Sequence, residues 1–300
     1  MNMLNLCDNT TITWQHNGRL FLLHIQRDDN AKSPRENDNL AVMACWHRDY
    51  ALGDKLDDKG AEAFWQRMVR ELVPSTVVIN SARNGQIHGI RTAPHPADDQ
   101  LCDIYLSVPW ETGGDRAAEY LAYAGVNVRD LYDYVVDELT PVQCQTLLHP
   151  YAVWLPIWLY DHSGLTISCG ERVYPYNDQW DSSCLGWIFV SKETMLREAG
   201  ATEDTWREHG FAILRGEVEE YDQYLRGDVY GYTLYVSDSS EDDESPDWEE
   251  TGDSCCGFYG SNITQNGMTD YVGCGLGDAI RTGEYQTGMA TLRKHYYYVF

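Results

Sequence analysis

The chain has 300 residues, of which 43% are hydrophobic and 12% aromatic, so it can bury a sizeable core and is not disordered throughout. Its 47 Asp and Glu outnumber its 22 Lys and Arg, which leaves a formal charge of −25. Repulsion from phosphates disfavours ordinary DNA or RNA binding and association with an anionic membrane surface. The charge favours a protein partner with a basic surface instead.

The first half of the chain predicts a mixture of strands and helices. Apolar residues alternate on both sides of Asn17 and Gly18, which predicts a hairpin over residues 11–26. A polar loop follows, and residues 40–46 then predict a short buried strand. Helical spacing of apolar residues predicts a helix over residues 60–72 that ends at Pro74. Strands are predicted over residues 76–79 and 101–108, and helices over residues 115–124 and 128–139.

From residue 151 the sequence becomes richer in β-formers and aromatic residues. Strands are predicted over residues 153–160, 165–169, 185–190 and 229–236, and helices over residues 191–199 and 202–225. The fold class predicted from this order is α+β, with mixed or antiparallel sheets and flanking helices. We expect two lobes: residues 1–150 form an N-terminal α+β lobe, and residues 151–300 form a β-rich lobe with a long acidic helix and an acidic loop over residues 238–253.

The cysteine pattern indicates a reduced, cytoplasmic protein. The nine cysteines are scattered, follow no leader typical of a signal peptide, and include no Cys-x-x-Cys pair. The longest apolar run, over residues 153–160, is far too short to span a bilayer, so no membrane segment is expected. No motif for a metal or cofactor site is recognised, because the cluster of Asp54, Asp57 and Asp58 lacks the spacing of a calcium loop and favours a solvated turn.

The acidic residues are concentrated in the final third of the chain. Between Glu217 and Asp253 there are 14 acidic residues and one basic residue, Arg226. A run such as residues 239–250 is most often a solvated surface loop. The whole-chain charge nevertheless exceeds what solubility needs, so these carboxylates can also present a field resembling that of DNA phosphates to a protein that binds nucleic acid.

One set of residues suggests chemistry. Cys184 could serve as a nucleophile with His162 as its base, which predicts a thiol-dependent hydrolase or modifying enzyme as an alternative function. The adjacent Asp161 is a poor candidate for orienting this histidine, because neighbouring residues of a strand point to opposite faces. The favoured interpretation is a buried thiol and a hydrogen-bonded histidine.

Three segments resemble a family of mostly uncharacterised proteins carried by phages and other mobile elements. They are RENDNLAVMACWHRDYALGDK (residues 35–55), LYDHSGLTIS with WDSSCLGWIFVSKE (within residues 159–193), and LRGEVEEYDQYLRGDVYGY with DSCCGFYG (within residues 214–260). The usual family forms have Gly where Ser183 stands and Trp where Cys256 stands. The resemblance implies a phage accessory protein, and strongly acidic proteins of this kind often inhibit host defence nucleases, including restriction, CRISPR and Gabija-type systems.

Charge and resemblance together lead to one hypothesis: a non-enzymatic anti-defence protein that binds a bacterial DNA-binding defence protein or nuclease and blocks its basic DNA-binding groove. The alternatives are the Cys184 and His162 enzyme and a structural or assembly protein of the virion, and the oligomeric state is left open. The residues expected to contact the partner are Glu217, Glu220, Asp222, Asp242, Asp243, Glu244, Trp248, Glu249 and Glu250.

Overall fold

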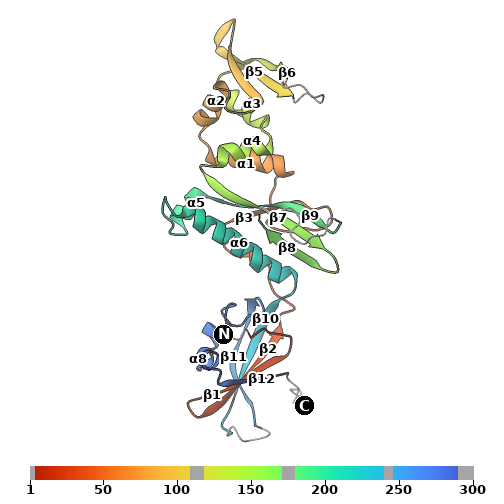
Figure 1. Cartoon of the computed structure of the whole chain (residues 1–300), viewed down its shortest axis with the longest axis vertical. Coiled ribbons are helices and arrows are strands. Elements are labelled where there is room, and N and C mark those ends of the chain that lie inside the picture. The colour runs from red at the N-terminus through yellow and green to blue at the C-terminus, as the bar shows by residue number, and fades with distance from the viewer. Residues whose placement is uncertain (1–3, 109–117, 171–179, 240–245, 290–300) are drawn as a thin grey trace, which may run out of the picture.

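The computed structural model describes residues 4–108, 118–170, 180–239 and 246–289 of the chain. Within these residues, eight α-helices and twelve strands form an α+β fold with three antiparallel sheets, which confirms the predicted fold class. The molecule is elongated, and the three sheets follow one another along its long axis (Figure 1). We call the parts built around them the lower, middle and upper parts, as they stand in Figure 1.

The lower part contains a five-stranded sheet in the order β11-β10-β2-β1-β12. Asn17 and Gly18 have φ angles of 51° and 77° and connect β1 to β2, so the predicted hairpin is confirmed. One face of the sheet packs against two short helices and forms an apolar core with them. The elements are β1 (Thr10–His16), β2 (Arg19–Arg27), β10 (Val229–Ser237), β11 (Glu249–Tyr259), β12 (Tyr285–Met289), α7 (Met268–Val272) and α8 (Leu276–Thr282).

The middle part contains a four-stranded sheet in the order β3-β9-β7-β8, with the long helix α6 lying across one face (Figure 1). Alternation along β7 directs Val153, Leu155, Ile157 and Leu159 into the core shared with α6. The elements are β3 (Val42–Cys45), β7 (Ala152–Asp161), β8 (Leu165–Cys169), β9 (Ser182–Ser191), α5 (Lys192–Arg197), α6 (Trp206–Leu225) and the 3-10 helix η1 (Pro34–Glu36).

The upper part contains a three-stranded sheet, β4-β5-β6, and four helices that connect it to the middle part. Phe64 and Trp65 of α1 pack edge to face against Phe189 of the middle sheet, so aromatic contacts join the two parts. The elements are α1 (Ala61–Leu72), α2 (Ser75–Arg83), β4 (Ile90–His95), β5 (Asp98–Val108), β6 (Ala118–Asn127), α3 (Leu131–Asp137) and α4 (Pro141–Leu148).

Two predicted elements are wrong. Residues 76–79 lie in helix α2, where Val78 and Ala82 bury one face of the helix, and do not form a strand. Residues 118–124 belong to strand β6, which pairs with β5, and do not form a helix; residues 115–117 lie outside the described residues. In both places the tertiary environment overrides local propensity.

Strand pairing crosses the boundary expected near residue 150. In the lower sheet, β1 and β2 lie beside β10 and β12, and in the middle sheet β3 pairs with β9. Among the three sheets of the described chain, the upper sheet alone draws all its strands from one of the two expected lobes. The lower and middle parts are connected by the segment between β2 and β3 and by the turn between α6 and β10.

Candidate protein-binding surface

Helix α6 carries three of the nine residues expected to contact a partner, Glu217, Glu220 and Asp222. Its buried residues follow a spacing of three and four, Trp206, Gly210, Leu214, Val218 and Tyr221, and this stripe packs on the middle sheet. Gly210 is needed for the close approach, because a Cβ atom at this position would lie 2.7 Å from Cγ2 of Val153. The residues between these positions lie at the edges of this buried stripe or on the solvent side of the helix.

Glu217 is engaged inside the protein. Arg35, which is buried, donates from Nη1 to Oε2 of Glu217 at 2.7 Å and from Nε and Nη2 to the two oxygens of Asp54 at 2.8 and 2.9 Å. The other oxygen of Glu217 accepts from the backbone N–H groups of Leu40 and Ala41 at 3.0 and 3.1 Å. Both oxygens of Glu217 are thus used to attach the segment before β3 to α6, and a contact between Glu217 and a partner stays a prediction.

Asp222 also has an internal role. Its Oδ1 accepts from the backbone N–H of Ile167 in the edge strand β8 at 2.8 Å, and its Oδ2 pairs with Arg226 at 2.9 Å. Burial nevertheless raises the pKa of Asp222, because desolvation outweighs these two favourable contacts. The Asp222 carboxylate therefore satisfies a backbone donor at the edge of the middle sheet, as Asp54 does for Met43 at the opposite edge.

The three segments quoted in the sequence analysis meet around α6. Arg35 and Asp54 come from the first segment, Ile167 from the second, and Glu217 and Asp222 from the third, and the contacts above join all three. The expectation for Asp54 is also corrected: it does not lie in a solvated turn but in the Arg35 network. The quoted segments thus share one structural unit, centred on the buried side of this helix.

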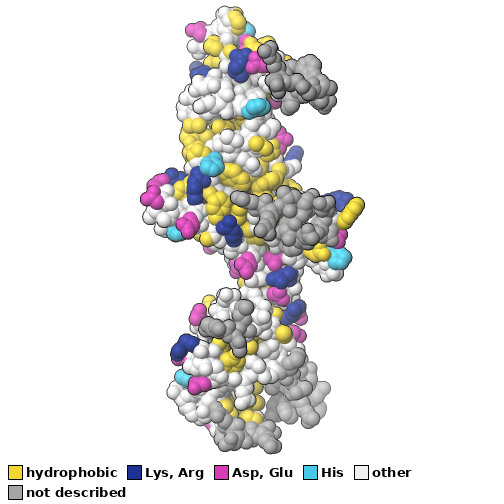
Figure 2. All heavy atoms as spheres, viewed as in Figure 1, with side chains coloured by type: hydrophobic (Ala, Val, Ile, Leu, Met, Phe, Trp, Pro, Cys, Tyr) yellow, Lys and Arg dark blue, Asp and Glu magenta, His cyan; other side chains and the backbone are white. Residues whose placement is uncertain are grey.

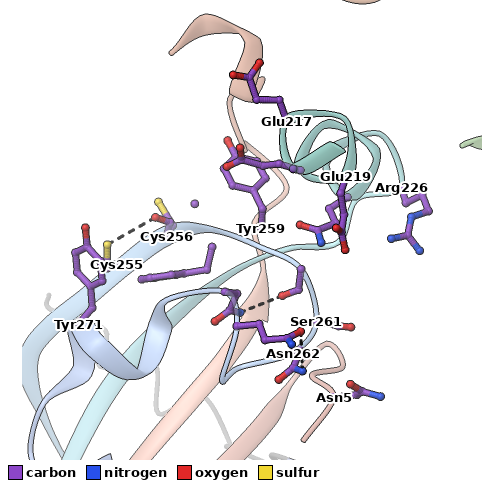
Figure 3. A pocket seen from close by; sticks show the side chains of 18 of the residues that line it. Asn5, Glu217, Glu219, Arg226, Cys255, Cys256, Tyr259, Ser261, Asn262 and Tyr271 are labelled. Carbon is purple, nitrogen blue, oxygen red and sulfur yellow. Dashed lines mark hydrogen bonds between the residues drawn. The ribbon is translucent and has the colours of Figure 1, made fainter. Parts of the chain in front are cut away.

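A groove lies between α6 and the lower sheet. It has a volume of about 1140 Å³ and is open to solvent, with α6 on one side and the end of β11 and the segment after it on the other (Figure 3). In Figure 3, Glu217 points away from the groove toward the segment that carries Arg35. The polar and aromatic residues that line the groove include Asn5, Glu219, Glu220, Gln223, Arg226, Cys256, Phe258, Tyr259, Asn262, Gln265, Asn266 and Tyr271.

Glu219 and Glu220 are the acidic residues of α6 that line this groove without an internal partner. Glu219 is exposed and Glu220 is half-buried, and neither forms a hydrogen bond or an ion pair with the described residues. Burial, and then the charge of Glu217, raise the pKa of Glu220. The surroundings of Glu220 therefore disfavour the ionised form of its carboxyl group.

Three of the remaining predicted contact residues, Trp248, Glu249 and Glu250, lie at the other end of β11. Glu249 and Glu250 are exposed, Trp248 just before them is half-buried, and Asp242, Asp243 and Glu244 lie outside the described residues. Glu249 is opposite Val236 and Tyr259 is opposite Val229, so the two ends of β11 are about 23 Å apart along the sheet. The described carboxylates of the predicted set consequently form two separate groups, one on α6 and one at the far end of β11.

Acidic side chains elsewhere are distributed over the surface. On the face shown in Figure 2 they lie singly or in small groups, from the upper part to the lower part, and hydrophobic side chains gather across the middle. On this face the described acidic residues form no continuous anionic ridge of the kind that close mimicry of a DNA strand would need.

Cys184 and His162 are not arranged as a nucleophile and its base. His162 Nδ1 lies 2.8 Å from Oδ2 of Asp181, at the start of the turn after β7. Cys184 of β9 is paired with Trp158 of β7. Trp158 lies four residues before His162, so Cys184 and His162 are about 13 Å apart along the strand. Cys184 is exposed, so the expectation of a buried thiol is wrong. Desolvation nevertheless raises the pKa of its thiol, which disfavours the thiolate that a nucleophile requires.

Comparisons with known proteins assign no family to this chain. No protein-family model matches it, and neither the curated proteins nor the solved structures gave a match. Within the described residues, no three His, Cys, Asp or Glu side chains gather in a way that could hold a metal ion. None of the described helices combines the length and the apolar composition needed to cross a membrane.

Sequence reasoning missed Arg35 and Asp54 as partners of α6, and it missed the groove. The ion pair joins residues 182 positions apart, and no local pattern encodes such a pairing. Arg35 and Asp54 both stand in the quoted segment of residues 35–55. An arginine in a polar loop of that segment was the signal available for this ion pair. The groove depends on how the lower sheet sits beside α6, which the sequence pattern does not specify.

Proposed function

We propose that this chain is a non-enzymatic binding protein that uses its negative charge to dock on a basic surface of another protein. The supporting observation is the pair of acidic groups without internal partners among the described residues, Glu219 and Glu220 beside the groove and Glu249 and Glu250 on β11. The formal charge of −25 adds long-range attraction to a cationic partner and speeds encounter. Internal pairing of Glu217 and Asp222 restricts the docking role to the other carboxylates.

The partner that we propose is a bacterial DNA-binding defence protein or nuclease, whose DNA groove the chain would block. This finer proposal is supported by the resemblance of the three segments to phage proteins and by the excess of carboxylates. Blocking does not require a continuous imitation of a DNA strand, because two acidic groups about 23 Å apart can engage two parts of one basic groove. Exclusion of DNA by occupation of its binding groove is the mechanism expected.

The first experiment identifies the partner and then measures the ionic contribution. The full chain is used to capture its partner from a lysate of defence-competent bacteria, and the dissociation constant of the purified pair is measured from 50 to 500 mM salt. We expect the affinity to fall steeply with salt and duplex DNA to compete with the chain for the partner. An affinity that does not respond to salt would contradict docking by charge.

Charge reversal tests which carboxylates contact the partner. Glu249→Lys with Glu250→Lys should weaken binding at least tenfold, because each substitution replaces attraction with repulsion. The matched control is Asp204→Lys with Glu208→Lys, which makes the same change in net charge near the other end of α6, where both residues are exposed. Equal losses in the two double variants would show a general effect of net charge and no specific surface.

A further inference from the structure

The groove has two walls of different chemistry. The α6 wall carries the carboxylates of Glu219 and Glu220, and the opposite wall carries the aromatic rings of Phe258, Tyr259 and Tyr271 (Figure 3). Phe258 is buried and packs edge to face with Tyr271 at 5.4 Å, while Tyr271 is 68% exposed. Carboxylates facing aromatic rings form an environment that suits an organic cation.

Contacts around the groove hold its walls in place. The Tyr259 hydroxyl donates to the carbonyl of Lys32 at 2.7 Å, in the segment that leads from β2 to the middle part. The side chain of Gln223 lies so close to Gly260 that a Cβ atom at this position would be 3.0 Å from Nε2 of the glutamine. Asn266 donates to the carbonyl of Gly260 at 3.0 Å. The site is therefore pre-formed at the junction of α6 and β11.

Glu220 indicates the charge of the ligand that the groove would bind. Its carboxylate is half-buried, and among the described residues it has neither a hydrogen bond nor an ion pair. Tyr259 on the facing wall is near enough for the charge of Glu220 to contribute, after burial, to the raised pKa of that phenol. A charged group in a partly desolvated site without a partner is costly, and a cation placed between the two walls would offset this cost.

The lining favours a guanidinium over an ammonium group. A guanidinium is planar, stacks on tyrosine rings and donates hydrogen bonds in a fork that matches a carboxylate. It is also less strongly hydrated than an ammonium group, so it enters a half-buried site at a lower cost. The volume of about 1140 Å³ exceeds the needs of one side chain and leaves space for the neighbouring residues of an extended segment.

We propose that this groove binds arginine side chains presented by an extended basic segment of the partner, with Glu219 and Glu220 pairing with the guanidinium and Tyr259 packing on its face. The proposal rests on the proposed function and names the chemistry that the groove recognises. It makes the groove the part of the docking surface that recognises arginine, while Glu249 and Glu250 on β11 contact a second part of the partner's basic surface.

The experiment uses the full chain and three acetylated, amidated peptides of the sequence Gly-X-Gly-X-Gly, in which X is arginine, lysine or citrulline. Citrulline keeps the shape of arginine and removes its charge. Binding is followed by NMR through the shifts of the carboxyl carbons of glutamate and of the tyrosine rings. We expect the arginine peptide to bind at least tenfold more tightly than the citrulline peptide and more tightly than the lysine peptide, and to lower the pKa of Glu220.

Variants locate the site. Glu220→Gln should weaken binding of the arginine peptide at least tenfold, and Glu208→Gln, about 18 Å away along the same helix, should leave it within twofold. The groove assignment is overturned if the citrulline peptide binds equally well or if Glu220→Gln has no effect. In that case a partner affinity that still falls with salt and with charge reversal at Glu249 and Glu250 would leave the proposed function standing, whereas indifference to both would remove it as well.

Discussion

Arg35 donates a hydrogen bond to Glu217 at 2.7 Å although 182 positions separate the two residues in the chain. The same guanidinium holds Asp54 with two parallel hydrogen bonds. These contacts connect the segment before β3, the loop after it and the middle of α6. An arginine between two carboxylates is thus the link that keeps the helix of the candidate surface in place, and its removal is the most direct test of this role.

Replacing Arg35 with Met should lower the free energy of unfolding by about 3–5 kcal/mol, because Asp54 and Glu217 would keep negative charges in a largely buried place without a counter-charge. Chemical denaturation followed by circular dichroism measures the change. The control is Arg19→Met, whose ion pair with Asp238 is exposed and should contribute less than about 1 kcal/mol. Similar losses in both variants would contradict the role assigned to Arg35.

Replacing either of two glycines of α6 with alanine should change the stability of the chain, but in opposite directions. Gly216→Ala adds a methyl group where no atom lies within 4 Å, so higher helix propensity should stabilise the chain by about 0.5–1 kcal/mol. Gly210→Ala gains the same propensity but places Cβ 2.7 Å from Val153, and overpacking should make the net change destabilising by about 1–2 kcal/mol. Thermal unfolding of the two variants compares them, and stabilisation by both would show that α6 does not approach the sheet as closely as described.

Glu220→Gln should stabilise the chain at neutral pH. The pKa of Glu220 is raised by burial and by Glu217, so the folded chain holds this proton more tightly than the unfolded chain does. Ionisation above the raised pKa therefore costs stability, and the variant avoids this cost. The advantage of the variant should disappear below about pH 4, where the carboxyl is protonated in both states. Denaturation from pH 3 to 8 tests this, with exposed Glu219→Gln as the control, and a variant that is less stable at pH 7 would contradict it.

Cys184 should react slowly with iodoacetamide at pH 7. Desolvation raises the pKa of its thiol, so its thiolate fraction is lower than that of a cysteine in an unstructured peptide. Mass spectrometry of digested samples taken over time gives the alkylation rate at each cysteine. Cys184→Ser should also leave partner binding unchanged. A reaction at Cys184 faster than with the free peptide would instead favour the thiol-dependent enzyme.

The local elements that follow a clear pattern could be predicted from the sequence. The hairpin around Asn17 and Gly18 was predicted because both residues tolerate positive φ angles, which such a turn requires. The strand over residues 165–169 was predicted with the bounds that β8 has, since its apolar residues stand between turn formers. These predictions depend on contacts between near neighbours, which the sequence encodes directly.

Predictions from the sequence failed where contacts between residues far apart in the chain determine the structure. Residues 76–79 are rich in β-branched residues, yet Pro74 precedes a helix that buries Val78 and Ala82 against the upper core. In β6, alanine and leucine suggest a helix, but pairing with β5 provides the backbone hydrogen bonds. At the candidate site, the sequence placed Glu217 and Glu220 in one predicted helix, but it could not show that Arg35 engages Glu217 and leaves Glu220 beside a groove.

The lower sheet sets a condition on the order in which the chain can fold during synthesis. Strand β2 is followed by roughly 200 residues before its neighbour β10 is made, and β12, which pairs with β1, comes later still. At about 5–20 residues per second, the first hairpin waits at least about 10 s without these neighbours. During this interval the apolar face formed by Ile12, Leu23 and Ile25 lacks the elements that later cover it, so the growing chain exposes apolar surface that favours aggregation.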